Sequence, residues 1–141
     1  MAKMGIKVDV TDNTGKISNQ MFKNLKQAVT DVTLDIKRVS SASAPHKSGF
    51  LEKNTHDIQA GADFIEGSVS FKAVNKGFDY AEWTHNADYN LGEKSKRKSG
   101  GKSRYGSGSV PVGKGYLKNT VENGRAGYRE HIIKAFGDAY K

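Results

Sequence analysis

The stretch from Gly108 to Gly115 comes closest to a chemical motif in this chain. It reads Gly-Ser-Val-Pro-Val-Gly-Lys-Gly, near the pattern G-x-x-x-x-G-K-[ST] that cradles nucleotide phosphates. Gly115 lacks the hydroxyl that would bind magnesium, and no buried strand is predicted before the loop. The similar ending Gly101-Lys102-Ser103 has Lys96 where the first glycine should stand. We therefore interpret these glycines as hinges of a flexible loop and not as a nucleotide site.

The other side chains suited to catalysis or metal binding are isolated along the chain. The histidines are His46, His56, His85 and His131. None has a second histidine at i+4 on a predicted helix, and the chain has no cysteine. Ser48 and Ser109 would need a general base and an orienting carboxylate to act as nucleophiles, and no pattern marks either group. We predict surface or capping roles for the histidines, no metal, no cofactor and no enzymatic activity.

One basic segment carries the whole net charge of +8. Residues 94–118 contain no Asp or Glu, and elsewhere the Lys and Arg residues equal the Asp and Glu residues in number. The basic residues of this segment are Lys94, Lys96, Arg97, Lys98, Lys102, Arg104, Lys114 and Lys118. Gly and Ser fill much of the rest, so the segment cannot bury enough apolar surface to fold alone. We predict a mobile arm or extended loop over residues 86–113, called the basic loop below.

The basic loop is suited to docking on a partner or to facing DNA. The residues that we expect to do this are Lys94, Lys96, Arg97, Lys98, Lys102, Arg104, Tyr105 and Lys114. Tyr105 is the only aromatic residue well inside the run of cations, whereas Tyr80, Trp83 and Tyr89 lie outside it. Those three aromatics therefore read first as core and rim residues and not as a platform for stacking bases.

Length and composition favour a single domain, residues 1–141, with one modest core. The absence of cysteine indicates that the protein was not built for an oxidising compartment, and we expect synthesis in a cytoplasm. The first ten residues mix charges with apolar residues and do not resemble a signal peptide. Because no run approaches the ~20 apolar residues needed to cross a bilayer, we predict no membrane insertion.

The regions on either side of the basic loop have regular hydrophobic periods. Alternation from Ile6 to Val10 predicts a short strand. Next, apolar residues at spacings of three and four predict a long helix that starts near Ser18 and stops before Pro45. The apolar positions of this helix are Phe22, Leu25, Val29, Val32, Ile36 and Val39. This seam fits an intramolecular core better than a coiled-coil face, although the spacing suits both.

The second half of the chain predicts further strands and a last helix. Residues 51–60 read as extended, and residues 65–73 alternate as a strand with one wet face. The aromatic cluster from Phe78 to Trp83 returns to the sheet or forms a short helix at its edge. A C-terminal helix follows from Leu117, with a bend or a close helix contact expected at Gly124 and Gly127. The order predicts an α+β domain: a small antiparallel sheet packed by a long N-terminal helix and a C-terminal helix.

Four local patterns, taken in order, resemble the tail-completion or head-to-tail joining proteins of long-tailed, non-contractile phages. They are the element Ala44–Leu51, the strand after it, the segment Tyr80–His85 continuing to Gly92, and the segment Val112–Leu117 that opens the last helix. The matching residues are Pro45, Gly49, Leu51, Tyr80, Ala81, Trp83, His85, Gly113, Tyr116 and Leu117. The chain departs from the family pattern at His46, Lys47 and Gly115.

The resemblance implies a structural virion protein of the phage neck, also labelled a minor capsid protein. Such a protein is made in the bacterial host cytoplasm and joins the head connector to the tail. It would assemble with itself as a ring of six copies around the DNA path and contact neighbouring neck, connector and tail-tube proteins. The basic loop would then order against a neighbouring subunit during viral assembly, with at most weak nonspecific DNA contact.

Two other functions compete with this interpretation. A nucleic-acid-binding module that uses the basic loop is the main alternative, because clustered cations next to Tyr105 suit phosphate contacts. A small toxin or nuclease-like domain is the third, but the sequence lacks a cluster of acids and histidines that would hold a metal or activate water.

Overall fold

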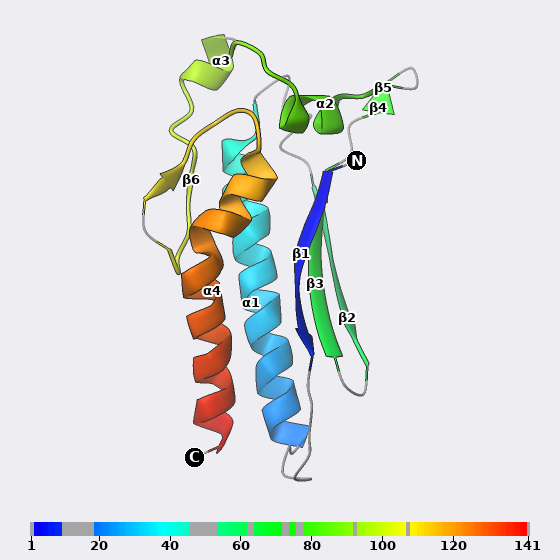
Figure 1. Ribbon diagram of the computed structural model, residues 1–141, viewed down its shortest axis with the longest axis vertical. Coiled ribbons are helices and arrows are strands. Elements are labelled where there is room, and N and C mark those ends of the chain that lie inside the picture. Colours follow the sequence, from blue (N-terminus) through cyan, green and yellow to red (C-terminus); the bar gives the residue numbers. More distant parts are fainter. Residues whose placement is uncertain are drawn as a thin grey trace.

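The computed structural model describes residues 2–9, 19–45, 54–61, 64–71, 74–75, 78–91, 93–106 and 108–140. A three-stranded antiparallel sheet is covered on one face by two long helices, as Figure 1 shows. This confirms the predicted α+β class. None of the helices in the described ranges is both long and apolar enough to span a bilayer.

The sheet is built from β1 (Ala2–Asp9), β2 (Thr55–Ala60) and β3 (Phe64–Phe71) in the order β1-β3-β2. Both outer strands run antiparallel to β3, so β1 and β2 run in the same direction with β3 between them. The predicted alternation is confirmed at Ile65, Val69 and Phe71, which are fully buried, but Ser68 on the predicted wet face is buried too, and residues 72–73 lie outside the described residues. The sheet therefore begins as a split β-α-β unit, with α1 as the crossover.

Helix α1 (Asn19–Ser43) ends two residues before Pro45, as predicted. Its apolar seam is core: Leu25, Val29, Val32, Ile36 and Val39 are buried, and Phe22 is partly buried. Helix α4 (Tyr116–Tyr140) packs along α1, as Figure 1 shows, and it also contacts β1. The heptad spacing of α1 thus serves intramolecular packing.

Short elements fill the region between β3 and α4. They are β4 (Val74–Asn75), β5 (Phe78–Asp79), α2 (Tyr80–Asn86), α3 (Glu93–Lys96), β6 (Gly101–Lys102) and β7 (Ser109–Val110). The aromatic cluster forms the predicted short helix, α2, which Asp79 caps by accepting hydrogen bonds from the backbone N–H groups of Ala81 and Glu82. Strands β6 and β7 pair antiparallel as a small hairpin.

The described residues of the basic loop lie against α1 and are hydrogen-bonded to it. Ser43 of α1 donates a hydrogen bond from its hydroxyl to the Val110 carbonyl at 2.9 Å and accepts one from the Gly101 N–H at 2.9 Å. The Lys98 ammonium donates to the carbonyl of Ala44 at 2.6 Å, where α1 ends. The loop has little apolar surface of its own, but α1 supplies both the surface and the hydrogen-bond partners that it lacks.

Two glycines allow the basic loop to lie close to the helices. A Cβ atom at Gly101 would overlap the backbone carbonyl of Val39 in α1. A Cβ atom at Gly127 would overlap the carbonyl oxygen of Tyr105. The sequence predicted a bend or a close helix contact at Gly127, but the close neighbour is the loop, and α4 continues through this residue as one helix.

Replacement of Gly101 by alanine should detach the basic loop while the core remains folded. The new methyl group cannot fit beside the Val39 backbone, so trypsin should cut after Lys102 and Arg104 about tenfold faster or more. Digestion rates followed by mass spectrometry measure this effect. Gly108→Ala is the matched control: its φ of +80° imposes strain of about 1 kcal/mol, but its Cβ would meet open space. Equal cleavage rates in both variants would contradict the close packing.

Candidate functional site

Three of the four family-like segments meet at one end of the helix pair. Tyr116, at the start of α4, is fully buried and donates its hydroxyl to the Ala81 carbonyl of α2 at 2.8 Å. Burial raises the pKa of Tyr116 to about 12, so the hydroxyl stays a donor at neutral pH. Gly113, in the segment before α4, donates its N–H to the Ser43 carbonyl near the end of α1 at 3.1 Å. We call this meeting point of α1, α2 and α4 the motif junction.

His85 binds both sides of the motif junction. Its carbonyl accepts from the N–H of Gly115 at 2.8 Å, and its Nε2 accepts from the N–H of Lys118 at 3.1 Å. The imidazole also lies edge-on to the ring of Tyr116, with centroids 5.0 Å apart. His85 therefore satisfies N–H groups at the start of α4, which is the capping role predicted for the histidines.

The remaining residues of the family-like set fall in three groups. Ala81 and Leu117 are fully buried, and Gly113 is buried with a φ of +130° that favours glycine. Pro45 is buried just after α1, and Tyr80 is the first residue of α2. The predicted residues Gly49 and Leu51 lie outside the described residues.

Exposed aromatic rings lie beside the motif junction. Trp83 is 44% exposed and stacks on Tyr89, with ring centroids 5.2 Å apart and planes at 23°. Phe78, in the strand that leads into α2, is 46% exposed. Tyr89 is held in place because its hydroxyl donates to the Thr84 carbonyl. Trp83 and Tyr89 form an aromatic patch, and large exposed aromatics such as Trp83 are the anchors that protein interfaces favour.

The carboxylate of Asp35 joins α1 to the basic loop and to α4. It accepts hydrogen bonds from the Ser103 hydroxyl at 2.6 Å, the Tyr128 hydroxyl at 2.7 Å and the Arg104 backbone N–H at 3.2 Å. The Arg38 guanidinium adds a fourth donor at 2.9 Å. Burial by itself would raise the pKa of Asp35, but the hydrogen bonds together lower it below its ordinary value. The ionised carboxylate is therefore the form that the fold stabilises.

Sequence reasoning missed Asp35 as an organising residue. A signal was present, because Asp35 follows Val32 by three residues and precedes Val39 by four, which places a carboxylate on the apolar seam. The identity of its donors carried no signal, since Ser103 and Tyr128 lie 68 and 93 residues away along the chain.

Three of the predicted docking cations, Arg97, Lys98 and Arg104, line hollows beside α1. Lys96, Arg97, Lys102 and Arg104 are exposed, and Lys98 is partly buried against the end of α1. Lys114 is instead paired with Asp88 at 2.9 Å, beside the aromatic patch. Lys94 belongs to α3. The structure therefore separates Lys114 from the other predicted cations.

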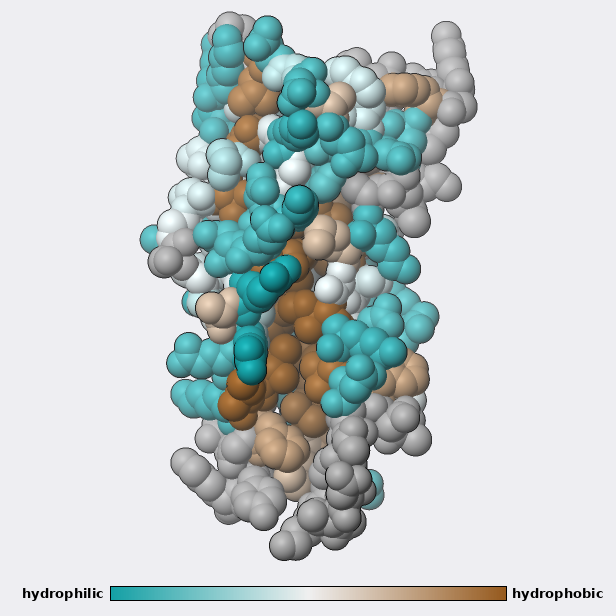
Figure 2. Space-filling view, in the orientation of Figure 1, coloured by the Kyte–Doolittle hydropathy of each residue, from teal (hydrophilic) through white to brown (hydrophobic). Residues whose placement is uncertain are grey.

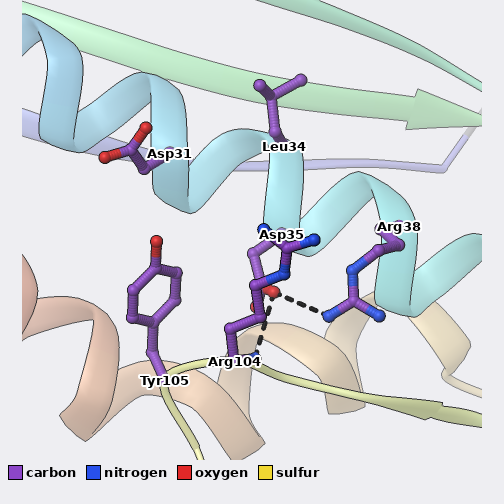
Figure 3. A pocket seen from close by; sticks show the side chains of 6 residues that line it. All are labelled: Asp31, Leu34, Asp35, Arg38, Arg104 and Tyr105. Atoms are coloured by element: carbon purple, nitrogen blue, oxygen red, sulfur yellow. Dashed lines mark hydrogen bonds and ion pairs between the residues drawn. The ribbon is translucent and has the colours of Figure 1, made fainter.

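Two hollows adjoin at Arg38. The larger is an open groove of about 530 Å³ between the last turns of α1 and residues 97–100, and no acidic residue is among the described side chains that line it. The smaller, of about 260 Å³, is lined by Asp31, Leu34, Asp35, Arg38, Arg104 and Tyr105, as Figure 3 shows. We call the larger hollow the basic groove.

The chemical groups around the smaller hollow do not form a catalytic constellation. His131 lies 3.1 Å from the Asp31 carboxylate, and its ring packs 4.5 Å from the ring of Tyr105. The nearby Ser103 hydroxyl donates to Asp35 and not to His131. Among the residues that the structure describes, no three His, Asp or Glu side chains gather in a way that could hold a metal. These contacts connect α1, the basic loop and α4.

Comparisons with known proteins do not assign a family. A scan against models of protein families found no match. Searches of curated proteins and of solved structures found no significant match. The resemblance to neck proteins therefore depends on the motif residues, and function has to be argued from the geometry.

Removal of the Asp35 charge should change the pH dependence of stability. The folded pKa of Asp35 lies below the unfolded value of about 3.9, so its stabilisation is complete above that pH and is lost as the pH falls through the folded pKa. Asp35→Asn should lower the free energy of unfolding at pH 7 by about 3 kcal/mol and flatten its decline below about pH 4. Urea unfolding from pH 2 to 7 measures both effects, with exposed Asp57→Asn as control. A wild-type pH profile in Asp35→Asn would contradict this account.

Proposed function

We propose that this protein is a structural, non-enzymatic component of a phage neck that helps to join the head connector to the tail. The observation that carries the proposal is the motif junction. Family-like segments separated by more than thirty residues each contribute buried contacts there, for example Tyr116 to Ala81. Residues that resemble one family and also pack on each other are better support than separate short matches would be.

The surfaces of the molecule suit assembly. A ring needs two different patches on each subunit, because each copy meets one neighbour with one patch and the other neighbour with the second. The aromatic patch around Trp83 and the basic groove around Arg97 are two such patches with different chemistry. We propose a ring of six copies around the DNA path, located in the virion between connector and tail tube.

Electron microscopy and native mass spectrometry of the protein mixed with its neck and tail partners test this function. Rings that contain several copies are expected. Trp83→Ala should fold normally but form at least tenfold fewer rings, because it removes an exposed anchor of the aromatic patch. Ile133→Ala is the matched control, because it also truncates an exposed apolar side chain but lies on α4, outside the aromatic patch. A wild-type protein that stays monomeric with all its partners would overturn the proposal.

The basic groove supports a second candidate, nonspecific binding of nucleic acid. Arg38, Arg97 and Lys98 line it, and although Arg38 is already paired with Asp35, the two cations at Arg97 and Lys98 suit a phosphate backbone. Both functions are compatible, since a ring around DNA has reason to present weak positive charge.

The salt dependence of the affinity for duplex DNA tests this second candidate, because each phosphate contact adds to the slope. If five exposed or groove cations meet phosphates, log affinity for duplex DNA should fall with log salt at a slope near −4.5, from about 0.9 per contact. Arg97→Ala combined with Arg104→Ala should make the slope shallower by about 2. Lys23→Ala, on the exposed side of α1, should leave it unchanged. A slope near zero in the wild-type protein would remove this candidate.

A further inference from the structure

The two long helices are wider than the sheet that they cover. Packed helices lie about 8–10 Å apart, so a helix pair covers roughly 20 Å, whereas three strands at about 4.8 Å spacing cover roughly 14 Å. Helix α1 packs on all three strands, most closely on β3, and α4 packs chiefly on β1. Since β1 is an outer strand, α4 must extend past it. A fourth strand beside β1 would fit under α4.

The space below α4 is apolar. Figure 2 shows a stripe of apolar residues down the face of the molecule between α4 and β1. The side chains that supply it are only partly buried: Ile6 and Val8 from β1, and Ile132 and Phe136 from α4. Side chains that their own chain leaves partly exposed still gain from further burial, at about 25 cal/mol for each Å² removed from water.

The outer edge of β1 is open among the described residues. Every ladder contact of β1 is made with β3, and no backbone hydrogen bond joins β1 to any other described segment. An unpaired edge of eight residues offers N–H and C=O groups that another extended chain can use. The opposite edge, β2, is also an outer strand, but α1 is centred over β3 and does not project past β2 in the same way.

Positive charge borders the apolar stripe on both sides. Lys3 and Lys7 point to the exposed face of β1, where Asp9 pairs with Lys7 at 3.6 Å and leaves Lys3 as the cation without an acid on its own strand beside it. On α4, Lys118, Arg125 and Arg129 recur with Ile132 and Phe136 at helical spacing, so they share one flank of the helix. All three of these α4 cations are exposed, with Glu122 as the one acidic residue between them. A ligand for this edge therefore needs apolar side chains towards α4 and acidic ones on its other face.

We propose that β1 and the projecting flank of α4 form an acceptor for an extended segment of another neck protein, which adds a fourth strand to the sheet. Main-chain hydrogen bonds to β1 supply affinity, and alternate apolar and acidic side chains supply specificity. This proposal rests on the proposed function only for the identity of the partner as a neck protein. The acceptor surface itself is argued from the contacts and exposure of β1 and α4.

A second copy of this protein is a poor donor of that strand. If β2 of one copy paired with β1 of the next in a continuous sheet, each copy would contribute three strands, or roughly 14 Å, for two helices that need roughly 20 Å. The α4 helix of one copy would then overlap the α1 helix of its neighbour. The geometry therefore favours a single strand that brings no helix of its own.

Hydrogen exchange on the full-length protein tests the acceptor with a nine-residue peptide of alternating valine and glutamate. Binding should slow the exchange of alternate amides in β1, whose N–H groups face outward, and leave those of β2 unchanged. A peptide with serine in place of valine should not bind, because it cannot fill the apolar stripe. Absence of protection at β1, or equal protection at β2, would overturn the proposal.

Variants of the protein distinguish peptide binding at this site from nonspecific attraction between the acidic peptide and the basic protein. Lys3→Glu combined with Lys7→Glu should weaken peptide binding about tenfold by fluorescence anisotropy, because two cross-strand attractions become repulsions. Phe136→Ser should weaken binding to a similar degree. The matched control is Lys23→Glu with Lys26→Glu, on the exposed side of α1, which should have no effect. If the control weakens binding equally, the site is wrong, whereas ring formation can still succeed; the two proposals therefore fail separately.

Discussion

The buried carboxylate of Asp35 is the interaction on which the arrangement of this protein depends. It lies on the apolar seam of α1 and is stabilised by four donors from α1, the basic loop and α4. A buried charge is costly unless it is fully hydrogen-bonded, so the carboxylate specifies where each donor must be. Because Tyr128 comes from α4 and Ser103 from the loop, one side chain aligns the helix pair and holds the loop against it.

At the end of α1, hydrogen bonds of Ser43 and of the motif junction likewise hold distant segments together. Ser43 joins both strands of the β6–β7 hairpin to the helix, and Tyr116 joins α4 to α2. The loop therefore has several fixed attachments, although it has almost no core of its own. This has a consequence for any partner that binds there, because a pre-positioned groove costs less entropy to occupy than an arm that must fold on binding.

The proposed neck role and the proposed strand acceptor assign different faces of the molecule to different contacts. The aromatic patch lies beside α2, the basic groove lies between α1 and the loop, and the apolar stripe lies between α4 and β1. The hydrogen-bonded interior links all three faces to the same two helices. A subunit of this kind can present several rigid surfaces at once, which suits a protein that acts by assembly and not by catalysis.

Local pattern determined much of this fold in advance. The seam from Leu25 to Val39, the stop before Pro45, the alternation in β3 and the C-terminal helix were all predicted, because hydrophobic period and proline chemistry act between near neighbours in the chain. The position of the basic loop was not predictable, since its attachment depends on Ser43, Asp35 and a glycine contact with Val39, each far away in sequence. The composition of the loop showed where the net charge lies along the chain. It indicated a mobile arm and did not predict how the backbone is attached to α1. Only the tertiary structure decided that α1 supplies the missing partners, and that α4 packs chiefly on β1, an outer strand of the sheet.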